Sequence, residues 1–223
     1  MRTVGYILFC LILTSCNLKS SDYYYSEARK LEFEGKYIEA ILLLDKAIEK
    51  NPRNIFALIN RGVDKSLLED YMGAIDDYSR IIEIDKNNTL AYLNRGKNKK
   101  RIEDYRGAIE DFDRAIKTKG GEFLWIDKVE NPFVDDGFEF DVMMEEIRYV
   151  RGFARYYSDS LQLALKDFNF CIQKNYYLST SYYMVGLIYI AYGNIDEACK
   201  ILLKSRDLGD VDAQELLDKY CEK

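Results

Sequence analysis

Histidine is absent from all 223 residues of the chain. It is the most frequent general base in enzymes, a common metal ligand and the side chain that titrates nearest to neutral pH. The sequence also contains no glycine-rich phosphate loop, and no serine or cysteine with a predicted base beside it. We therefore expect a protein that is not an enzyme and that needs no cofactor and no metal ion.

Proline is scarce, and basic residues are not in excess over acidic ones. Two prolines and 13 glycines leave little room for disordered linkers, so we expect one extended domain. The formal net charge of −6 opposes general nucleic-acid binding, which needs a basic face to neutralise phosphates. What the chain has instead is 48% apolar residues and 19 tyrosines, a residue type that suits protein interfaces.

Cysteine is present but in odd number once the N-terminal segment is set aside. Cys10 and Cys16 belong to that segment, which leaves Cys171, Cys199 and Cys221 for the folded part. These three could all be buried thiols, or two of them could form a disulfide with one thiol left over. The sequence leaves both interpretations open.

The first fifteen residues are typical of an export signal. One basic residue precedes an apolar run over residues 4–13, which is too short to span a bilayer. The next residues, Leu13-Thr14-Ser15-Cys16, resemble the lipobox of bacterial lipoproteins. The resemblance implies that residues 1–15 are a signal peptide and that Cys16 carries acyl chains, such as palmitate, that hold the protein on a membrane. An ordinary secretory signal is the alternative.

The residues after Cys16 bear on its destination. In enterobacterial lipoproteins an aspartate at the next position signals retention in the inner membrane, whereas this chain has Asn17. We therefore expect the bacterial cell envelope, at the outer membrane, with residues 16–20 as lipidated cysteine and tether. Asp159-Ser160-Leu161 matches a short O-glycosylation pattern of Bacteroidetes, which favours a Bacteroidetes-like origin.

Related blocks of sequence recur every 34 residues, as YMGAIDDYSRII at 71–82 and YRGAIEDFDRAI at 105–116 show. The alanine of each block recurs as Ala40, Ala74, Ala108, Ala164 and Ala198. Twelve residues earlier stand the small residues Ala28, Gly62, Gly96, Gly152 and Gly186. Four residues later stand the large residues Leu44, Tyr78, Phe112, Phe168 and Leu202. The small residues suit positions where the two helices of a hairpin cross closely, and the large ones would fill the space between neighbouring hairpins. The regular spacing predicts stacked helical hairpins, with one insertion after the third hairpin.

This pattern resembles the tetratricopeptide repeat, a 34-residue unit of two helices. The resemblance implies an all-α fold, a right-handed superhelix of five hairpins. Repeats 1–3 would occupy residues 21–122 as 21–54, 55–88 and 89–122. An acidic and aromatic insertion would follow at 123–144, then repeats 4–5 at 145–212 as 145–178 and 179–212, and a capping helix at 213–223.

The resemblance also implies that the first helix of each hairpin lines a concave groove that binds a protein or peptide. The predicted partner-binding residues are Tyr25, Arg29, Phe56, Ile59, Val63, Leu93, Lys97, Lys100, Arg101, Tyr149, Phe153, Tyr156, Tyr183 and Leu187. A mostly apolar and aromatic groove suits an apolar or amphipathic peptide. The alternative is that several of these residues belong to the core between repeats.

One basic cluster interrupts that apolar surface. Lys97, Lys100 and Arg101 share a helical face and could receive a carboxylate or a phosphate, although a solvated face is the alternative. The insertion at 123–144 combines five aromatic residues with six acidic ones. We expect it to fold back across the groove, near the basic cluster, where it would complete or occlude the site; a loop on the convex side is the alternative. Its carboxylates do not follow calcium-loop spacing.

The sequence thus predicts a membrane-anchored interaction scaffold or adaptor of the cell envelope. A lipid-anchored immunity protein that neutralises a toxin is the alternative function. The sequence does not identify the protein partner or the oligomeric state.

Overall fold

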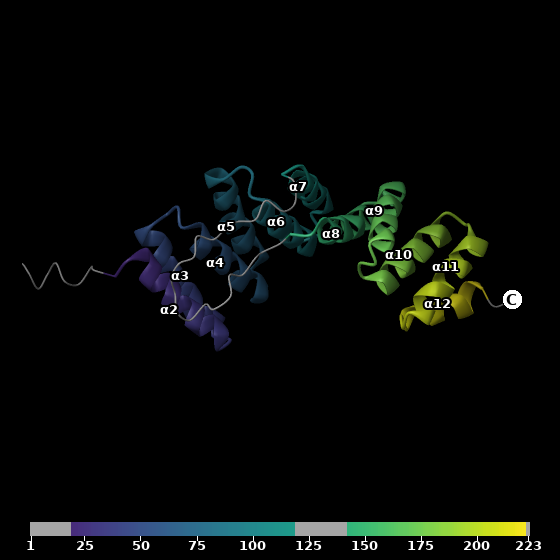
Figure 1. Cartoon of the computed structure of the whole chain (residues 1–223), viewed down its shortest axis with the longest axis horizontal. Coiled ribbons are helices and arrows are strands. Elements are labelled where there is room, and N and C mark those ends of the chain that lie inside the picture. The colour runs from purple at the N-terminus through teal and green to yellow at the C-terminus, as the bar shows by residue number, and fades with distance from the viewer. Residues whose placement is uncertain (1–18, 119–141, 222–223) are drawn as a thin grey trace, which may run out of the picture. The chain divides into compact units, whose positions relative to one another are not determined.

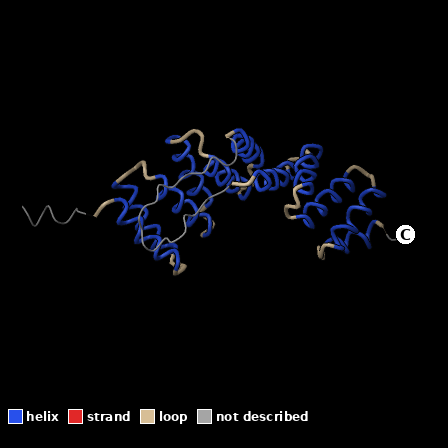
Figure 2. Tube along the Cα trace, viewed as in Figure 1, coloured by secondary structure: helices blue, strands red, loops and turns tan. Residues whose placement is uncertain are grey.

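The computed structural model describes residues 19–118 and 142–221, and this part of the chain is helical and contains no strand (Figures 1 and 2). Its helices are α2 (Ser21–Phe33), α3 (Tyr37–Lys50), α4 (Ile55–Leu67), α5 (Tyr71–Ile84), α6 (Thr89–Arg101), α7 (Tyr105–Lys117), α8 (Met144–Tyr157), α9 (Leu161–Gln173), α10 (Leu178–Ala191), α11 (Ile195–Asp207) and α12 (Asp212–Tyr220). The predicted signal peptide, Cys16 and nearly all of the insertion at 123–144 lie outside the described residues. None of the described helices is long and apolar enough to cross a bilayer.

The helices pack as consecutive antiparallel pairs, as the repeat pattern predicts. The chain divides into two compact units, Met1–Ile84 and Asp85–Lys223, rather than one extended domain. In the first unit, α2 packs on α3 and α4 on α5, and α3 also packs on α4. In the second unit the pairs are α6 with α7, α8 with α9 and α10 with α11, and α12 packs on α11. The predicted all-α fold of stacked hairpins is therefore confirmed.

The small and large residues of the repeat meet inside each hairpin. A Cβ added at Gly96 would lie 2.7 Å from the ring of Phe112, and one at Gly152 would lie 2.9 Å from the ring of Phe168. Both rings are fully buried. The glycine therefore gives the ring the space that any side chain would fill, which explains why a small residue stands sixteen positions before each large one.

Asparagine side chains fix where two of the first helices begin. Asn54 Oδ1 accepts a hydrogen bond from the backbone N–H of Ala57 at 3.0 Å, and Asn88 Oδ1 accepts one from Ala91 at 2.9 Å. Such caps satisfy backbone donors that have no partner within the helix. Asn54 also donates to Ser21 Oγ at 2.8 Å, which joins the two hairpins of the first unit.

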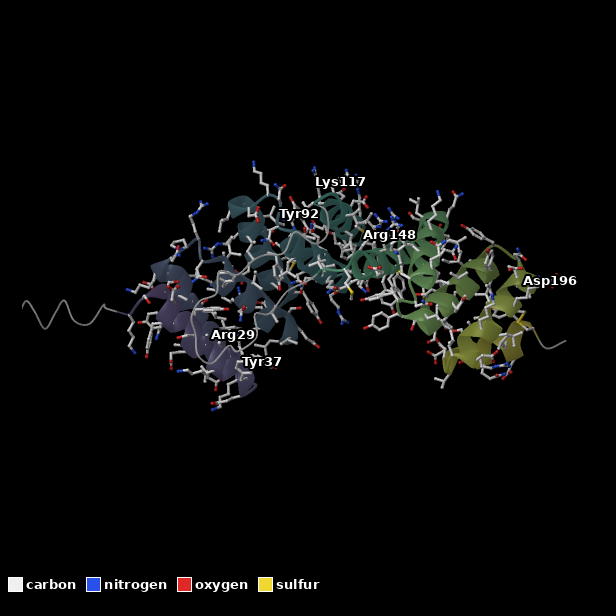
Figure 3. The ribbon with its side chains drawn as sticks, viewed as in Figure 1. Arg29, Tyr37, Tyr92, Lys117, Arg148 and Asp196 are labelled. Atoms are coloured by element: carbon white, nitrogen blue, oxygen red, sulfur yellow. A yellow bond between two sulfur atoms is a disulfide. The ribbon has the colours of Figure 1, made fainter. Side chains whose placement is uncertain are left out.

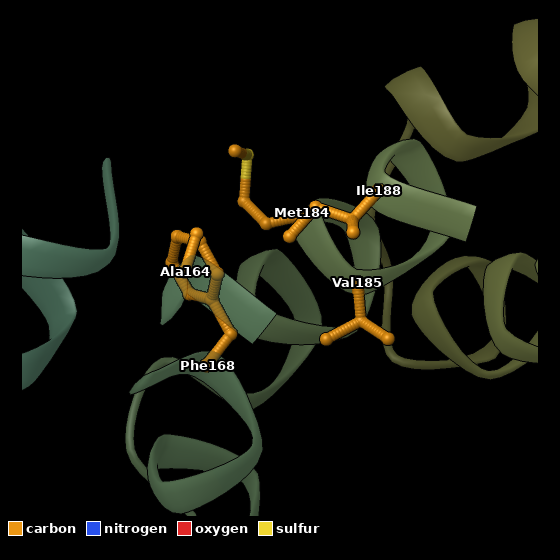
Figure 4. Close-up of a cluster of buried hydrophobic side chains, with 5 residues drawn as sticks. All are labelled: Ala164, Phe168, Met184, Val185 and Ile188. Carbon is orange, nitrogen blue, oxygen red and sulfur yellow. The ribbon is translucent and has the colours of Figure 1, made fainter. Parts of the chain in front are cut away.

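The core of the second unit lies between neighbouring hairpins. Figure 4 shows one cluster of buried side chains, formed by Ala164, Phe168, Met184, Val185 and Ile188. Partly buried aromatic residues of α8 and α10 pack against it, so the core continues toward the surface on the side of the first helices. Each hairpin thus hides apolar area that its neighbour would otherwise expose to water.

The C-terminal helix α12 covers the last hairpin, as the capping role predicts. Leu202 of α11 is buried together with Ala213 and Leu217 of α12. A disulfide joins Cys199 of α11 to Cys221 at the end of α12. Cys171 is a free, buried cysteine. Of the two interpretations that the sequence leaves open, one bridge and one remaining thiol is therefore the one observed.

Candidate interaction surface

The first helices α8 and α10 of the second unit present an aromatic surface. Tyr149, Phe153 and Tyr156 of α8 and Tyr183 and Leu187 of α10 are partly buried and rest on the core cluster described above. Each side chain therefore has one part in the core and another facing solvent. The two interpretations of these residues, partner contact and inter-repeat core, are not exclusive, because the core contacts hold the rings in position.

Two tyrosines that the sequence analysis did not select extend this surface. Tyr177, in the link before α10, stacks on Tyr149 with ring centroids 4.8 Å apart, and Tyr176 meets Tyr149 edge to face at 5.8 Å. Tyr177 is 60% exposed and has a φ of +40°, in the left-handed region that side chains other than glycine rarely adopt. No 34-residue spacing marks these positions, which is why the repeat pattern did not reveal them.

The predicted basic cluster borders the same surface, and its members have different surroundings. Lys97 Nζ donates to Glu146 Oε1 of α8 at 2.5 Å, so its charge is paired within the unit. Lys100 Nζ lies 5.3 Å from the ring centroid of Phe153, and no carboxylate of the described residues forms an ion pair with it. Burial, together with the positive charges of Arg101 and Lys97, lowers the pKa of Lys100. A carboxylate of a bound partner would offset these effects by stabilising the charged form of Lys100.

The first unit presents a smaller surface of mixed character. Tyr25 of α2 and Phe56 of α4 lie with ring centroids 6.3 Å apart. Arg29, labelled in Figure 3, forms an ion pair with Glu32 at 2.6 Å and lies over the ring of Phe33. Val63 is 40% exposed. These residues stand on the first helices, where the repeat resemblance places them.

Two predicted contact residues are in the core instead. Ile59 is 4% exposed and Leu93 is 1% exposed, so neither side chain is open to a partner. Each lies three residues before a glycine that admits a large ring, Gly62 and Gly96, on the part of the helix that faces its own hairpin. The expectation that Ile59 and Leu93 line an open groove is therefore wrong.

Buried ion clusters inside three hairpins were also missed by the sequence analysis. In each, an arginine before the glycine and a second basic residue four positions later bind an aspartate before the large ring. The sets are Arg61, Lys65 and Asp77; Arg95, Lys99 and Asp111; and Arg151, Arg155 and Asp167. The arginine and the aspartate are sixteen residues apart every time, so the signal was present in the sequence. Because the aspartates are buried, we assign these clusters to hairpin packing rather than to partner binding.

Metal-ligand groups and free thiols are two further kinds of candidate site. The described residues contain no group of three or more cysteine, aspartate or glutamate side chains placed to hold a metal ion. The free thiol of Cys171 is buried, and burial raises its pKa to about 12, which keeps it protonated and poorly nucleophilic.

Comparisons with known proteins address the fold. Residues 179–205, which span most of the α10–α11 hairpin, match the family model "Tetratricopeptide repeat". No curated protein matches the chain significantly. Among solved structures, that of YrrB, described as a TPR protein with an unusual peptide-binding site, has a TM-score of 0.72 at 18% identity and covers 94% of this chain and 97% of its own.

Two further solved structures have the same fold. MamA 41-end from Desulfovibrio magneticus RS-1 has a TM-score of 0.69 at 14% identity, covering 84% of this chain and 94% of its own. A repeat protein from Parabacteroides merdae has a TM-score of 0.61 at 16% identity, covering 93% of this chain and 68% of its own. The described chain thus has the fold of tetratricopeptide repeat proteins, and its α10–α11 hairpin matches the repeat itself.

Proposed function

We propose that this protein is an interaction module that holds an extended protein segment against the first helices of its second unit. The observation that supports this most directly is the aromatic surface of Tyr149, Phe153, Tyr156 and Tyr183 beside Lys100. Its rings are fixed by the core beneath them and remain partly open to solvent. Such a surface is preorganised, so the partner bears most of the ordering entropy on binding.

The chemistry of the surface suggests what the partner segment contains. Apolar side chains would cover the rings, and a carboxylate would meet Lys100, whose charge has no ion-pair partner among the described residues. Lys97 is less available, because Glu146 already binds it. The peptide-binding site named for YrrB, a protein of the same fold, is consistent with this proposal.

Charge reversal at Lys100 tests the proposal. Partner protein captured from envelope extracts by the immobilised chain should fall about tenfold or more with Lys100→Glu, because a favourable contact becomes a repulsive one. Quantitative mass spectrometry of the captured proteins provides the measurement.

The matched control is Lys166→Glu, which makes the same charge change on the second helix α9 at an exposed position. Its capture should equal that of the unchanged chain. Equal capture by Lys100→Glu and by the unchanged chain, with both folded by circular dichroism, would contradict the proposal. Phe153→Ala separates core from contact: a lower Tm with unchanged capture would make this ring a core residue only.

We further propose that the module is a lipoprotein of the bacterial cell envelope, anchored through Cys16. The lipobox-like Leu13-Thr14-Ser15-Cys16 supports this proposal. The disulfide between Cys199 and Cys221 supports it independently, because such bonds persist mainly in oxidising compartments outside the cytosol.

Replacing the proposed acylation site tests the anchor. Cys16→Ser removes the thiol that would be lipidated, so the chain should move from the membrane fraction to the soluble fraction. Immunoblotting of separated fractions provides the measurement, with Cys10→Ser as the control that should stay in the membrane fraction. Membrane attachment that survives Cys16→Ser would rule out this anchor.

A further inference from the structure

Two buried aspartates in the second hairpin differ in how their charges are satisfied. Asp77 of α5 is 1% exposed and accepts hydrogen bonds from Arg61 and Lys65. Asp64 of α4 is 2% exposed, and its Oδ2 atom has no hydrogen-bond partner in the described structure. A buried carboxylate without donors is strongly unfavourable. A second group must therefore make the burial of the Asp64 carboxyl group tolerable.

The neighbour of Asp64 across the α2–α4 contact is a second carboxyl group. Asn60, one turn before Asp64 on α4, donates to Glu32 of α2, so the Glu32 carboxyl group lies at the face of α4 that carries Asp64. Its two oxygens accept hydrogen bonds from Asn60 Nδ2 at 3.1 and 2.9 Å, and one of them also binds Arg29 Nη1 at 2.6 Å. Glu32 is thus surrounded by donors and suited to be the ionised member. Asp64 is suited to be the protonated member, because an O–H on Asp64 would donate to Glu32.

The charges around the pair agree with this assignment. Burial, and then the negative charge of Glu32, raise the pKa of Asp64 to about 7, while Arg29 of α2 lowers it. The other helices packed on α4 also carry carboxylates, Asp45 of α3 and Asp77 of α5. Both of these form ion pairs with Arg61 of α4. Within the first unit, the protonation state of Asp64 is therefore set by Glu32, Arg29 and burial.

We propose that Glu32 and Asp64 form a pH-sensitive fastening between α2 and α4, strong while the two side chains share a proton and weak once both are ionised. When α2 separates from α4, Asp64 meets water and returns to its ordinary acidity. Protons therefore favour the closed contact. Its stabilising contribution is full below about pH 4, declines as the pH rises and is gone above about pH 7. Tyr25, Arg29 and Phe56 lie on these two helices, so the surface that they form would loosen at alkaline pH.

Carboxyl titration by NMR and amide hydrogen exchange of the whole chain test the proposal. One aspartate carboxyl should titrate near pH 7 and disappear from the spectra of Asp64→Asn. After correction for intrinsic exchange rates, the protection of α2 amides should fall by at least about tenfold between pH 5 and pH 8. The protection of α10 amides, in the second unit, should be the same at pH 5 and pH 8.

Two variants provide the matched comparison. Asp64→Asn mimics the protonated side chain, because its amide can donate to Glu32, so the pH dependence of α2 protection should vanish. Asp77→Asn changes the other buried aspartate of the hairpin and should lower protection without removing that pH dependence. The proposal is overturned if α2 protection is the same at both pH values, or if its pH dependence persists in Asp64→Asn.

Discussion

Replacing Arg151 with methionine is expected to destabilise the second unit by about 3–5 kcal/mol. Asp167 is 1% exposed and accepts hydrogen bonds from Arg151 Nε at 2.9 Å and Nη2 at 2.5 Å. Methionine fills much of the volume but removes both donors, leaving Arg155 as the remaining cation on a buried carboxylate. Urea unfolding followed by circular dichroism provides the measurement.

Two variants show whether the cost arises from the unpaired charge. Arg148→Met makes the same substitution three residues earlier on α8, where the guanidinium lies 4.0 Å from the ring centroid of Phe170, and should cost only about 1 kcal/mol. The double variant Arg151→Met with Asp167→Leu removes both charges and should recover much of the loss, because a buried ion pair often contributes little net stability. A loss no larger than that of Arg148→Met would show that Arg155 alone satisfies Asp167.

The small and large residues of the repeat made the hairpins predictable from the sequence. Gly96 and Phe112 are sixteen residues apart because they meet where the two helices of one hairpin cross, and a local contact of this kind leaves a fixed interval in the chain. The capping role of α12 was predictable for a related reason, since apolar residues at helical spacing after the last hairpin need a surface to cover.

The candidate surface was predictable only in part, because helix position does not determine how deeply a side chain lies. Leu93 and Lys97 both belong to the predicted inner face of α6, yet Leu93 is buried while Lys97 reaches Glu146 of α8. Lys97 and Glu146 are 49 residues apart in the chain, so their pairing depends on how α8 packs on α6 and leaves no local pattern in the sequence. The pairing of Cys199 with Cys221 also depends on the packing of helices and cannot be read from cysteine counts.

Reduction of that disulfide is the second change for which we expect a large effect. A bond between residues 22 positions apart restricts the unfolded chain, and losing it should cost about 3 kcal/mol. The loss should be concentrated in α12, because this terminal helix packs mainly on α11 and no further hairpin covers its other side among the described residues. Hydrogen exchange with and without a reductant should therefore show faster exchange in α12 first, and a lower Tm.

Departure of α12 would also uncover part of the proposed interaction surface. Tyr183 and Ile190 of α10 pack against the cluster of Leu202, Ala213 and Leu217, so they would gain solvent exposure when the cap leaves. Cys221→Ser should reproduce the effect of the reductant, and a reductant should then have no additional effect on this variant. Cys171→Ser changes the free thiol instead and should leave the response to reductant intact. If reduction changes neither α12 exchange nor Tm, then the apolar contacts alone hold the cap, and the bridge adds nothing to them.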